Sequence, residues 1–349
     1  MTELTESDAP LPPHDSAPGA SPSPDPSAAT SAASSLQLLF IPLVLVAVTV
    51  LIWAILRWPT RETVTARDLA RDLSRPGRSH WQQAYSLAEL LRDPRHADLK
   101  QDAALAADLA AMLQLQLDAA EMDANRIHLR IFLCRALGEF AVPAVLPVLV
   151  QAGRQERGPA EIAVRRAALD ALAALASQAG AAALQNDDAV LQTLLAAAQD
   201  RGQAATDSGQ RAELRASAAF GLGVLGGAPA LRELQRLLED PSPNVRYNAA
   251  TGLARHGQTA AIPVLLDMLQ PENREAIAGE PSATGRAWKQ ALVWTNAIRA
   301  TRQLAQRNPT ADCRSLAAAM KSLVGSAVPA HVASQAREAL LALEKTQRE

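Results

Sequence analysis

The sequence predicts an all-α protein: a right-handed α-solenoid of stacked antiparallel helix pairs, preceded by one transmembrane helix and a disordered N-terminal tail. Three observations lead to this prediction. Hydrophobic residues make up 48% of the 349 residues and aromatic residues only 3%, so the apolar mass is Ala, Leu and Val rather than the residues that strands favour. Short amphipathic segments separated by Pro, Gly and Asp recur from about residue 60 onward. One uncharged apolar run precedes them.

The first predicted segment, residues 1–35, is an acidic tail rich in Pro, Ser and Ala. It contains five acids, seven prolines and no Lys or Arg, with too few apolar residues for a core, so we expect it to be disordered. The whole chain has a net charge of −2, and neither this value nor the small positive charge left after the tail indicates nucleic-acid binding. The 30 Arg against 4 Lys, together with abundant Ala, indicate a GC-rich bacterial genome.

Residues 36–56 are predicted to form a transmembrane helix. They carry no charge, and at 1.5 Å per residue they extend about 31 Å, close to the thickness of the hydrocarbon core of a bilayer. Trp53, Arg57 and Trp58 fall where this helix would leave the bilayer, which is the interfacial position that suits indole rings and cations. The flanks lack the features of a cleavable signal peptide.

Residues 57–78 form a basic juxtamembrane segment that predicts the orientation of the chain. Because positively charged flanks stay in the cytoplasm, we expect a single-pass protein of the inner (plasma) membrane, with its N-terminus outside and the solenoid in the cytoplasm. Anionic lipid is a candidate partner for four arginines at helical spacing, and an ordinary solvated helix face is the alternative. These residues are Arg67, Arg71, Arg75 and Arg78.

The segments after residue 79 share a repeat register. Four of them begin with an apolar residue and Arg, and seven residues after each Arg comes a Leu flanked by Ala or Gly. Small residues at such positions let neighbouring helices approach closely. The register arginines are 35, 50 and 31 residues apart, which indicates a solenoid unit of about 30 residues with insertions. The register residues are Arg130, Leu137, Arg165, Leu172, Arg215, Leu222, Arg246 and Leu253.

Residues 237–265 contain a recognisable sequence pattern. Its parts are Leu-Leu-Glu-Asp-Pro (237–241), Val-Arg (245–246), Ala-Ala (249–250), Leu253 and Ile-Pro-Val-Leu (262–265). This pattern resembles HEAT repeats, especially the phycobilisome-lyase HEAT-like repeats, and it is strongest over residues 124–270 of a solenoid predicted to span 79–349. The resemblance implies that the register arginines make structural contacts between helices and have no catalytic role. The helix expected over residues 286–306 fits the register poorly.

No catalytic, cofactor or metal site is predicted. Gly221 to Gly226 match the dinucleotide fingerprint G-x-G-x-x-G, but they continue a helix instead of joining a strand to a helix, so we predict no nucleotide there. Cys134 and Cys313 lie far apart within predicted helices, where core packing is the expected role. The six histidines have no metal-ligand spacing.

We therefore predict a non-catalytic, membrane-tethered scaffold or adaptor that binds a protein partner and no nucleic acid, and not an enzyme. One alternative is an accessory subunit of a protein-modifying or bilin-lyase-like enzyme, because some proteins with these repeats are bilin lyases. A second alternative is a structural tether without a defined partner. Three polar insertions, residues 151–161, 199–211 and 270–286, are expected to emerge along one edge and to contact the partner.

Overall fold

The computed structural model describes residues 80–119, 123–180, 184–185, 187–202 and 208–346, all within one compact unit, Val64–Glu349. The predicted tail 1–35, transmembrane helix 36–56 and juxtamembrane segment 57–78 lie outside the described residues. So do Trp53, Arg57 and Trp58 and the four arginines considered for lipid binding. Among the residues that the structure describes, no helix combines the length and apolar character needed to cross a membrane.

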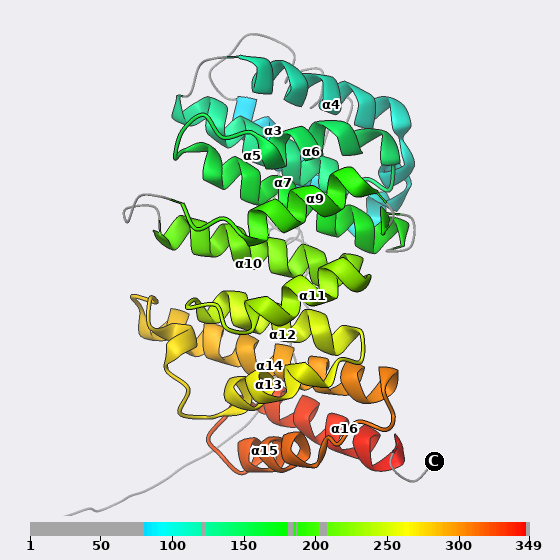
Figure 1. Cartoon of the computed structure of the whole chain (residues 1–349). Helices are drawn as coiled ribbons and strands as arrows, with labels where there is room; N and C mark the ends of the chain where they lie inside the picture. The colour runs from blue at the N-terminus through cyan, green and yellow to red at the C-terminus, as the bar shows by residue number, and fades with distance from the viewer. Residues whose placement is uncertain (1–79, 120–122, 181–183, 186, 203–207, 347–349) are drawn as a thin grey trace, which may run out of the picture. The chain divides into compact units, whose positions relative to one another are not determined.

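Every regular element in the described ranges is helical, as the Ala-rich and Leu-rich composition predicts (Figure 1). Short 3-10 turns separate some of the α-helices. The α-helices are α3 (His80–Arg92), α4 (Ala103–Asp118), α5 (Ala124–Gly138), α6 (Leu146–Arg154), α7 (Glu161–Ala179), α9 (Asp188–Ala198), α10 (Ser208–Leu225), α11 (Ala228–Leu237), α12 (Pro243–Arg255), α13 (Ile262–Leu269), α14 (Ala283–Arg307), α15 (Arg314–Val324) and α16 (Ala330–Thr346).

These helices pack in two layers. In the register-helix layer each helix contacts the next, in the order α3, α5, α7, α10, α12, α14 and α16. The second layer contains α4, α6, α9, α11, α13 and α15, each packed against the register helix that follows it in the chain. This arrangement confirms the predicted solenoid of helix pairs, while its handedness stays a prediction. It also corrects one expectation, because α14 takes a regular place between α12 and α16.

Local sequence signals explain where several helices begin. Asp102, Asp123 and Asp187 precede α4, α5 and α9, and each carboxylate accepts hydrogen bonds from backbone amides of the first turn. Pro229 and Pro263 occupy first-turn positions of α11 and α13, where the amide that proline lacks has no helical partner. The chain therefore turns from one layer to the other at sites that the sequence marks.

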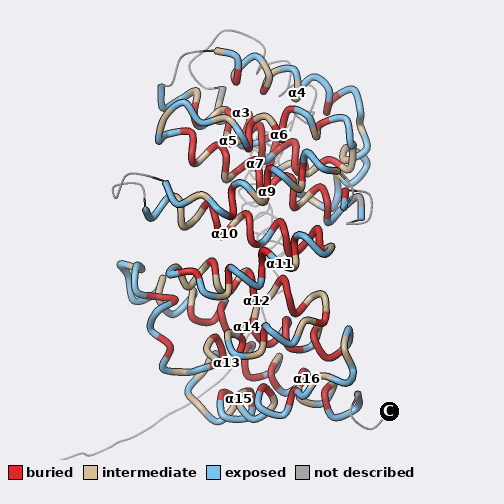
Figure 2. Tube along the Cα trace, viewed as in Figure 1, coloured by how far each residue is buried: buried red, intermediate tan, exposed pale blue. Residues whose placement is uncertain are grey.

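The buried hydrophobic residues form one connected core cluster, and Figure 2 shows buried positions along the helices of both layers. All four register leucines are buried in this cluster. Register helices also approach closely at glycine: a Cβ added to Gly138 would lie 2.7 Å from the Cα of Ala171, and one added to Gly223 would lie 2.6 Å from the Cα of Gly252. Gly221 and Gly223 of the apparent dinucleotide fingerprint thus lie inside α10, where Gly223 serves helix packing.

The close approach of α10 and α12 gives a stability prediction. Gly223→Ala should lower the free energy of unfolding by about 1–3 kcal/mol, because the new methyl group meets backbone and not a movable side chain. Gly209→Ala, in the same helix, is the matched control, since nothing lies within 4 Å of its Cβ position and it should change stability by less than about 0.5 kcal/mol. Denaturant unfolding of both variants measures this difference. Equal stabilities would show that α10 and α12 do not meet at Gly223.

Candidate functional site

Each register arginine connects its helix to the chain segment just before it, which is a loop or, for Arg165, the last turn of α6. Arg130, Arg165 and Arg215 are buried, and Arg246 is half-buried. Each guanidinium donates to a backbone carbonyl before its own helix. The acceptors are the carbonyl oxygens of Ala119 for Arg130 (3.2 Å), Gly153 for Arg165 (3.1 Å), Asp200 for Arg215 (3.1 Å) and Asp240 for Arg246 (2.9 Å).

Each register arginine also pairs with an acid in the next repeat unit. Because the acid lies in the next unit along the chain, the same guanidinium joins two consecutive units. The pairs are Arg130 with Glu161 (2.9 Å), Arg165 with Asp200 (2.8 Å), Arg215 with Asp240 (2.9 Å) and Arg246 with Glu275. We call this series the arginine ladder.

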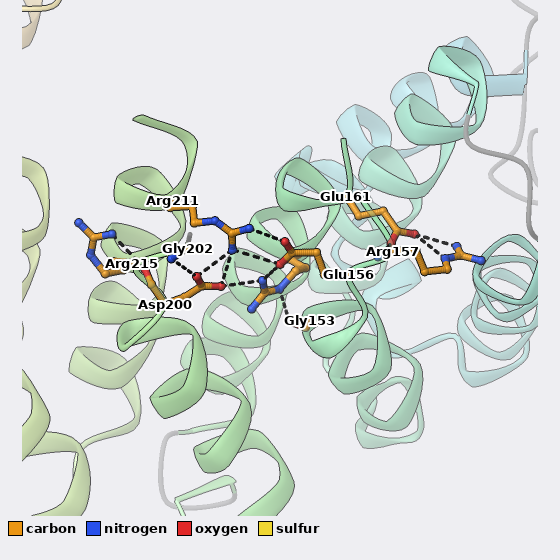
Figure 3. Close-up of polar contacts among 9 residues, drawn as sticks. Gly153, Glu156, Arg157, Glu161, Asp200, Gly202, Arg211 and Arg215 are labelled. Carbon is orange, nitrogen blue, oxygen red and sulfur yellow. Dashed lines mark hydrogen bonds and ion pairs between the residues drawn. The ribbon is translucent and has the colours of Figure 1, made fainter. Parts of the chain in front are cut away.

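The first two polar insertions are tied together by the same kind of contact (Figure 3). Arg211 pairs with Glu156 of the first insertion and with Asp200 of the second, the latter at 2.8 Å. Glu156 also pairs with Arg165. These two insertions therefore share an edge, as expected, but their charges are used within the chain.

Sequence reasoning missed one member of this pattern. Arg286, in the first turn of α14, donates to the carbonyl oxygens of Glu280 (2.9 Å) and Pro281 (3.0 Å). Arg246 donates to Asp240 and Pro241 at the same sequence offsets. The Pro-Ser dipeptide before both helices was the signal that could have placed α14 on the register.

A groove of about 740 Å³ lies over the N-terminal halves of α5, α7 and α10. Its size is typical of small-molecule sites, which are mostly apolar with a few polar groups that orient the ligand. The apolar part includes Ile127 and Ile162, and the polar groups include His128, Arg166 and Glu213. Arg166 and Glu213 form an ion pair of 3.7 Å across the α7 and α10 helices. None of these residues belongs to the predicted register set.

An aromatic cluster adjoins the groove through His128. The Trp81 ring centroid lies 5.9 Å from that of His128 and 6.0 Å from that of Phe132, with the latter rings stacked. Tyr85 meets Phe132 edge-on at 5.3 Å, and the Arg135 guanidinium lies 5.2 Å from the Phe132 centroid. The cluster provides flat apolar surface beside a cation, which favours a conjugated anionic ligand.

Asp170 lies one helical turn after Arg166 and thus on the same side of α7. Asp170 is exposed at the surface, yet the protein packed around its carboxyl group raises its pKa by desolvation. The Ser217 hydroxyl and the cations Arg166 and Arg135 act in the opposite direction. Asp170 thus lies one turn from the groove residue Arg166, and a carboxyl group with a raised pKa is suited to exchange a proton with a ligand that reaches it.

The cysteines offer no nucleophile. Cys134 is buried in α5, and burial raises the pKa of its thiol to about 12. Cys313 is buried before α15, and burial also raises its pKa. In the described part of the chain, no group of three or more His, Cys, Asp or Glu side chains is placed to hold a metal ion.

Known proteins resemble this chain in two ways. Residues 202–279 match HEAT repeats. The phycocyanobilin lyase subunit alpha of Picosynechococcus sp. is 32% identical over 159 residues, which are 44% of this chain and 58% of that relative. The chain thus spans less than two thirds of the length of the relative that it matches.

Two solved structures have similar helical arrangements. One belongs to the complex of CpcE and CpcF of the phycocyanin lyase from Nostoc sp., with a TM-score of 0.48, 18% identity, and coverage of 82% of this chain and 98% of that chain. The other is human deoxyhypusine hydroxylase, with a TM-score of 0.31, 19% identity, and coverage of 80% and 96%. Both TM-scores are below 0.5, so neither structure bears on the function of this chain.

The similarity to an enzyme subunit corrects two predictions. The prediction of a non-catalytic scaffold or adaptor is wrong, and so is the prediction that the chain is not an enzyme. The physical reason is that the repeat pattern reports contacts between neighbouring helices, whereas the groove combines side chains of three helices, from the buried Ile127 and Ile162 to the exposed His128. Such positions form no linear motif that a sequence pattern reveals.

The predicted location in the inner membrane is also corrected. The match is to a lyase subunit, and the helices of the described ranges include none that crosses a membrane. The prediction rested on residues 36–78, which lie outside the described residues.

The arginine ladder gives a prediction on acid stability. Burial alone would raise the pKa of Asp240, but Arg215, the Ser242 amide and Arg201 outweigh it, and the pKa is lowered. A lowered folded-state pKa means that the ion pair stabilises the fold fully above about pH 5, and that this stability is lost as the pH falls through the unfolded-state value of about 3.9 and below. Asp240→Asn should therefore cost about 3 kcal/mol at neutral pH and progressively less in acid.

The neighbouring exposed residue provides the control. Glu239→Gln changes the same charge one position away and should leave both the stability and its pH dependence unchanged. Urea unfolding between neutral pH and about pH 3 measures both variants. A constant difference between Asp240→Asn and wild type at every pH would contradict the lowered pKa.

Proposed function

We propose that this chain is a subunit of a bilin-lyase-like enzyme that binds a linear tetrapyrrole and acts with a second protein. The observation that carries the proposal is the 32% identity over 159 residues to a phycocyanobilin lyase subunit. The relative's name describes it as one subunit of an enzyme, which supports a protein partner for this chain.

The groove over α5, α7 and α10 is the proposed tetrapyrrole site. A bilin is a flat conjugated molecule with pyrrole N–H donors and propionate carboxylates. The groove supplies apolar walls and adjoins the stacked rings of Trp81 and Phe132. Its volume of about 740 Å³ is adequate for a ligand of this size.

Two polar residues match the two kinds of polar group on a bilin, the propionate carboxylates and the pyrrole N–H groups. Arg166, a groove residue, is assigned to a propionate carboxylate, since a guanidinium binds carboxylates through two parallel hydrogen bonds. Asp170 is assigned to the pyrrole N–H groups, because a carboxylate accepts the hydrogen bonds that these groups donate. The raised pKa of Asp170 suits a residue that exchanges a proton with the chromophore. Because both cysteines are buried, we assign the acceptor for the chromophore to another protein.

Binding of phycocyanobilin to the purified full chain tests this proposal. We expect a shift in the visible absorption of the pigment that saturates with protein. Arg166→Ala and Asp170→Asn should each weaken binding by about tenfold, because each removes a charge-assisted hydrogen bond. Arg232→Ala, an exposed arginine on α11 in the second layer, is the matched control and should bind as wild type does. Phycocyanobilin that keeps its free spectrum at every protein concentration would reject the proposal.

Transfer to an acceptor is a separate measurement. The full chain and a candidate second subunit are mixed with phycocyanobilin and apo-phycocyanin, and pigment that stays with the acceptor after denaturation is measured. We expect attachment above the rate without the chain, and a loss of that increase with Asp170→Asn.

A further inference from the structure

Two neighbouring register helices, α12 and α14, carry basic side chains and no acidic ones. The α12 helix contains two basic residues and α14 contains five, and neither contains Asp or Glu. The two helices contact each other in the register-helix layer. Part of this charge is used within the chain, because Arg246 pairs with Glu275, Lys289 pairs with Glu280 at 3.1 Å and Arg286 holds backbone carbonyls.

The side chains of the remaining arginines of α12 and α14 form no ion pair or hydrogen bond with the described residues. Among the described residues, no hydrogen bond or ion pair engages the guanidinium groups of Arg255, Arg299, Arg302 and Arg307. Arg299 and Arg302 are exposed, while Arg255 is half-buried. Burial and the nearby charge of Arg299 lower the pKa of Arg255. A carboxylate placed between Arg255 and Arg299 would relieve this repulsion.

Large apolar side chains share the same stripe of α14. Trp288 is 67% exposed and Leu292 is 42% exposed. The sequence spacing puts Trp288, Leu292, Arg299 and Arg302 on one side of the helix, because offsets of 4, 11 and 14 residues return to nearly the same angle. Exposed Trp and unpaired Arg on one side of a helix are residue types enriched in protein-interface hot spots.

We propose that this surface docks an acidic segment of a partner protein that carries apolar side chains among its carboxylates. We name it the α12–α14 face and define it by Arg255, Trp288, Leu292, Arg299 and Arg302. The charge complementarity, and the presence of exposed apolar and cationic side chains on one side of α14, favour a protein segment. A nucleic acid would need a longer basic stripe than a chain of net charge −2 provides here.

The α12–α14 face is separate from the groove, whose lining residues belong to or adjoin α5, α7 and α10. Its role as a protein-docking surface therefore does not depend on which small molecule the groove binds. The two proposals can fail independently.

Fluorescence anisotropy with a defined probe tests the docking proposal on the full chain. The probe is a fluorescein-labelled peptide of about 16 residues with Leu on one helical face and Glu on the other. We expect saturable binding that weakens with salt. Replacing each Leu of the peptide by Ser, or each Glu by Gln, should remove it.

Two double variants locate the binding. Trp288→Ala with Leu292→Ala, and Arg299→Glu with Arg302→Glu, should each lower affinity by about tenfold or more. All four side chains are exposed, so the variants should fold, and circular dichroism checks this. The matched control is Leu115→Ala with Arg232→Glu, which changes one exposed Leu and one exposed Arg in the second layer and should bind as wild type does.

Three results would overturn the docking proposal: no saturable peptide binding, equal affinity of both double variants and wild type, or stronger binding of a short DNA duplex or of phosphatidylglycerol vesicles at the same residues. The double variants should keep the phycocyanobilin spectral shift of wild type. Their loss of peptide binding with that shift intact would separate the docking face from the groove.

Discussion

The register arginine of α5, α7, α10 and α12 is the contact on which the alignment of these helices depends. Its guanidinium donates to a backbone carbonyl that precedes its own helix and pairs with a carboxylate of the next unit, as Arg215 does with the Asp200 carbonyl and the Asp240 side chain. A buried ion pair adds little net stability compared with apolar packing, since removing charges from water is costly. Its planar, directional hydrogen bonds do, however, fix one relative position of two helix pairs. We infer that the leucines supply most of the stabilisation and the arginines define the alignment.

That alignment determines which side chains lie next to one another on the solvent-facing surface of the register-helix layer. With α5, α7 and α10 held side by side, side chains far apart in sequence meet: His128, Arg166 and Glu213 line one groove. The same stacking brings α12 beside α14, so that Arg255 and Arg299 come close enough to interact. The small residues at the helix contacts contribute to this, because Gly223 and Gly252 allow the helix axes to approach more closely than side chains would.

The polar insertions are held to the helices by ion pairs and hydrogen bonds. Glu156 and Asp200 lie in segments that look like free surface loops in the sequence, yet both are held by Arg165 and Arg211. The third insertion is anchored as well: Asn273 donates to the Tyr247 hydroxyl at 2.6 Å. Burial raises the pKa of that hydroxyl to about 12, so it remains a neutral hydrogen-bonding group. Loop composition alone therefore does not identify a binding surface in this protein.

The sequence by itself determined the helical class, the two-helix repeat and the positions of the core leucines, because these follow from local periodicity and from the small residues that the stacking requires. It also marked helix starts at Asp187, Pro229 and Pro263. Only the tertiary structure decided which acids meet the register arginines, that α14 joins the register layer, and which exposed residues share a surface. Those contacts join residues about 25 to 55 positions apart, as with Arg215 and Asp240 or Glu156 and Arg211. The groove lining mixes buried and exposed residues of three helices that lie far apart in the sequence, so the groove exists only once the helices are packed.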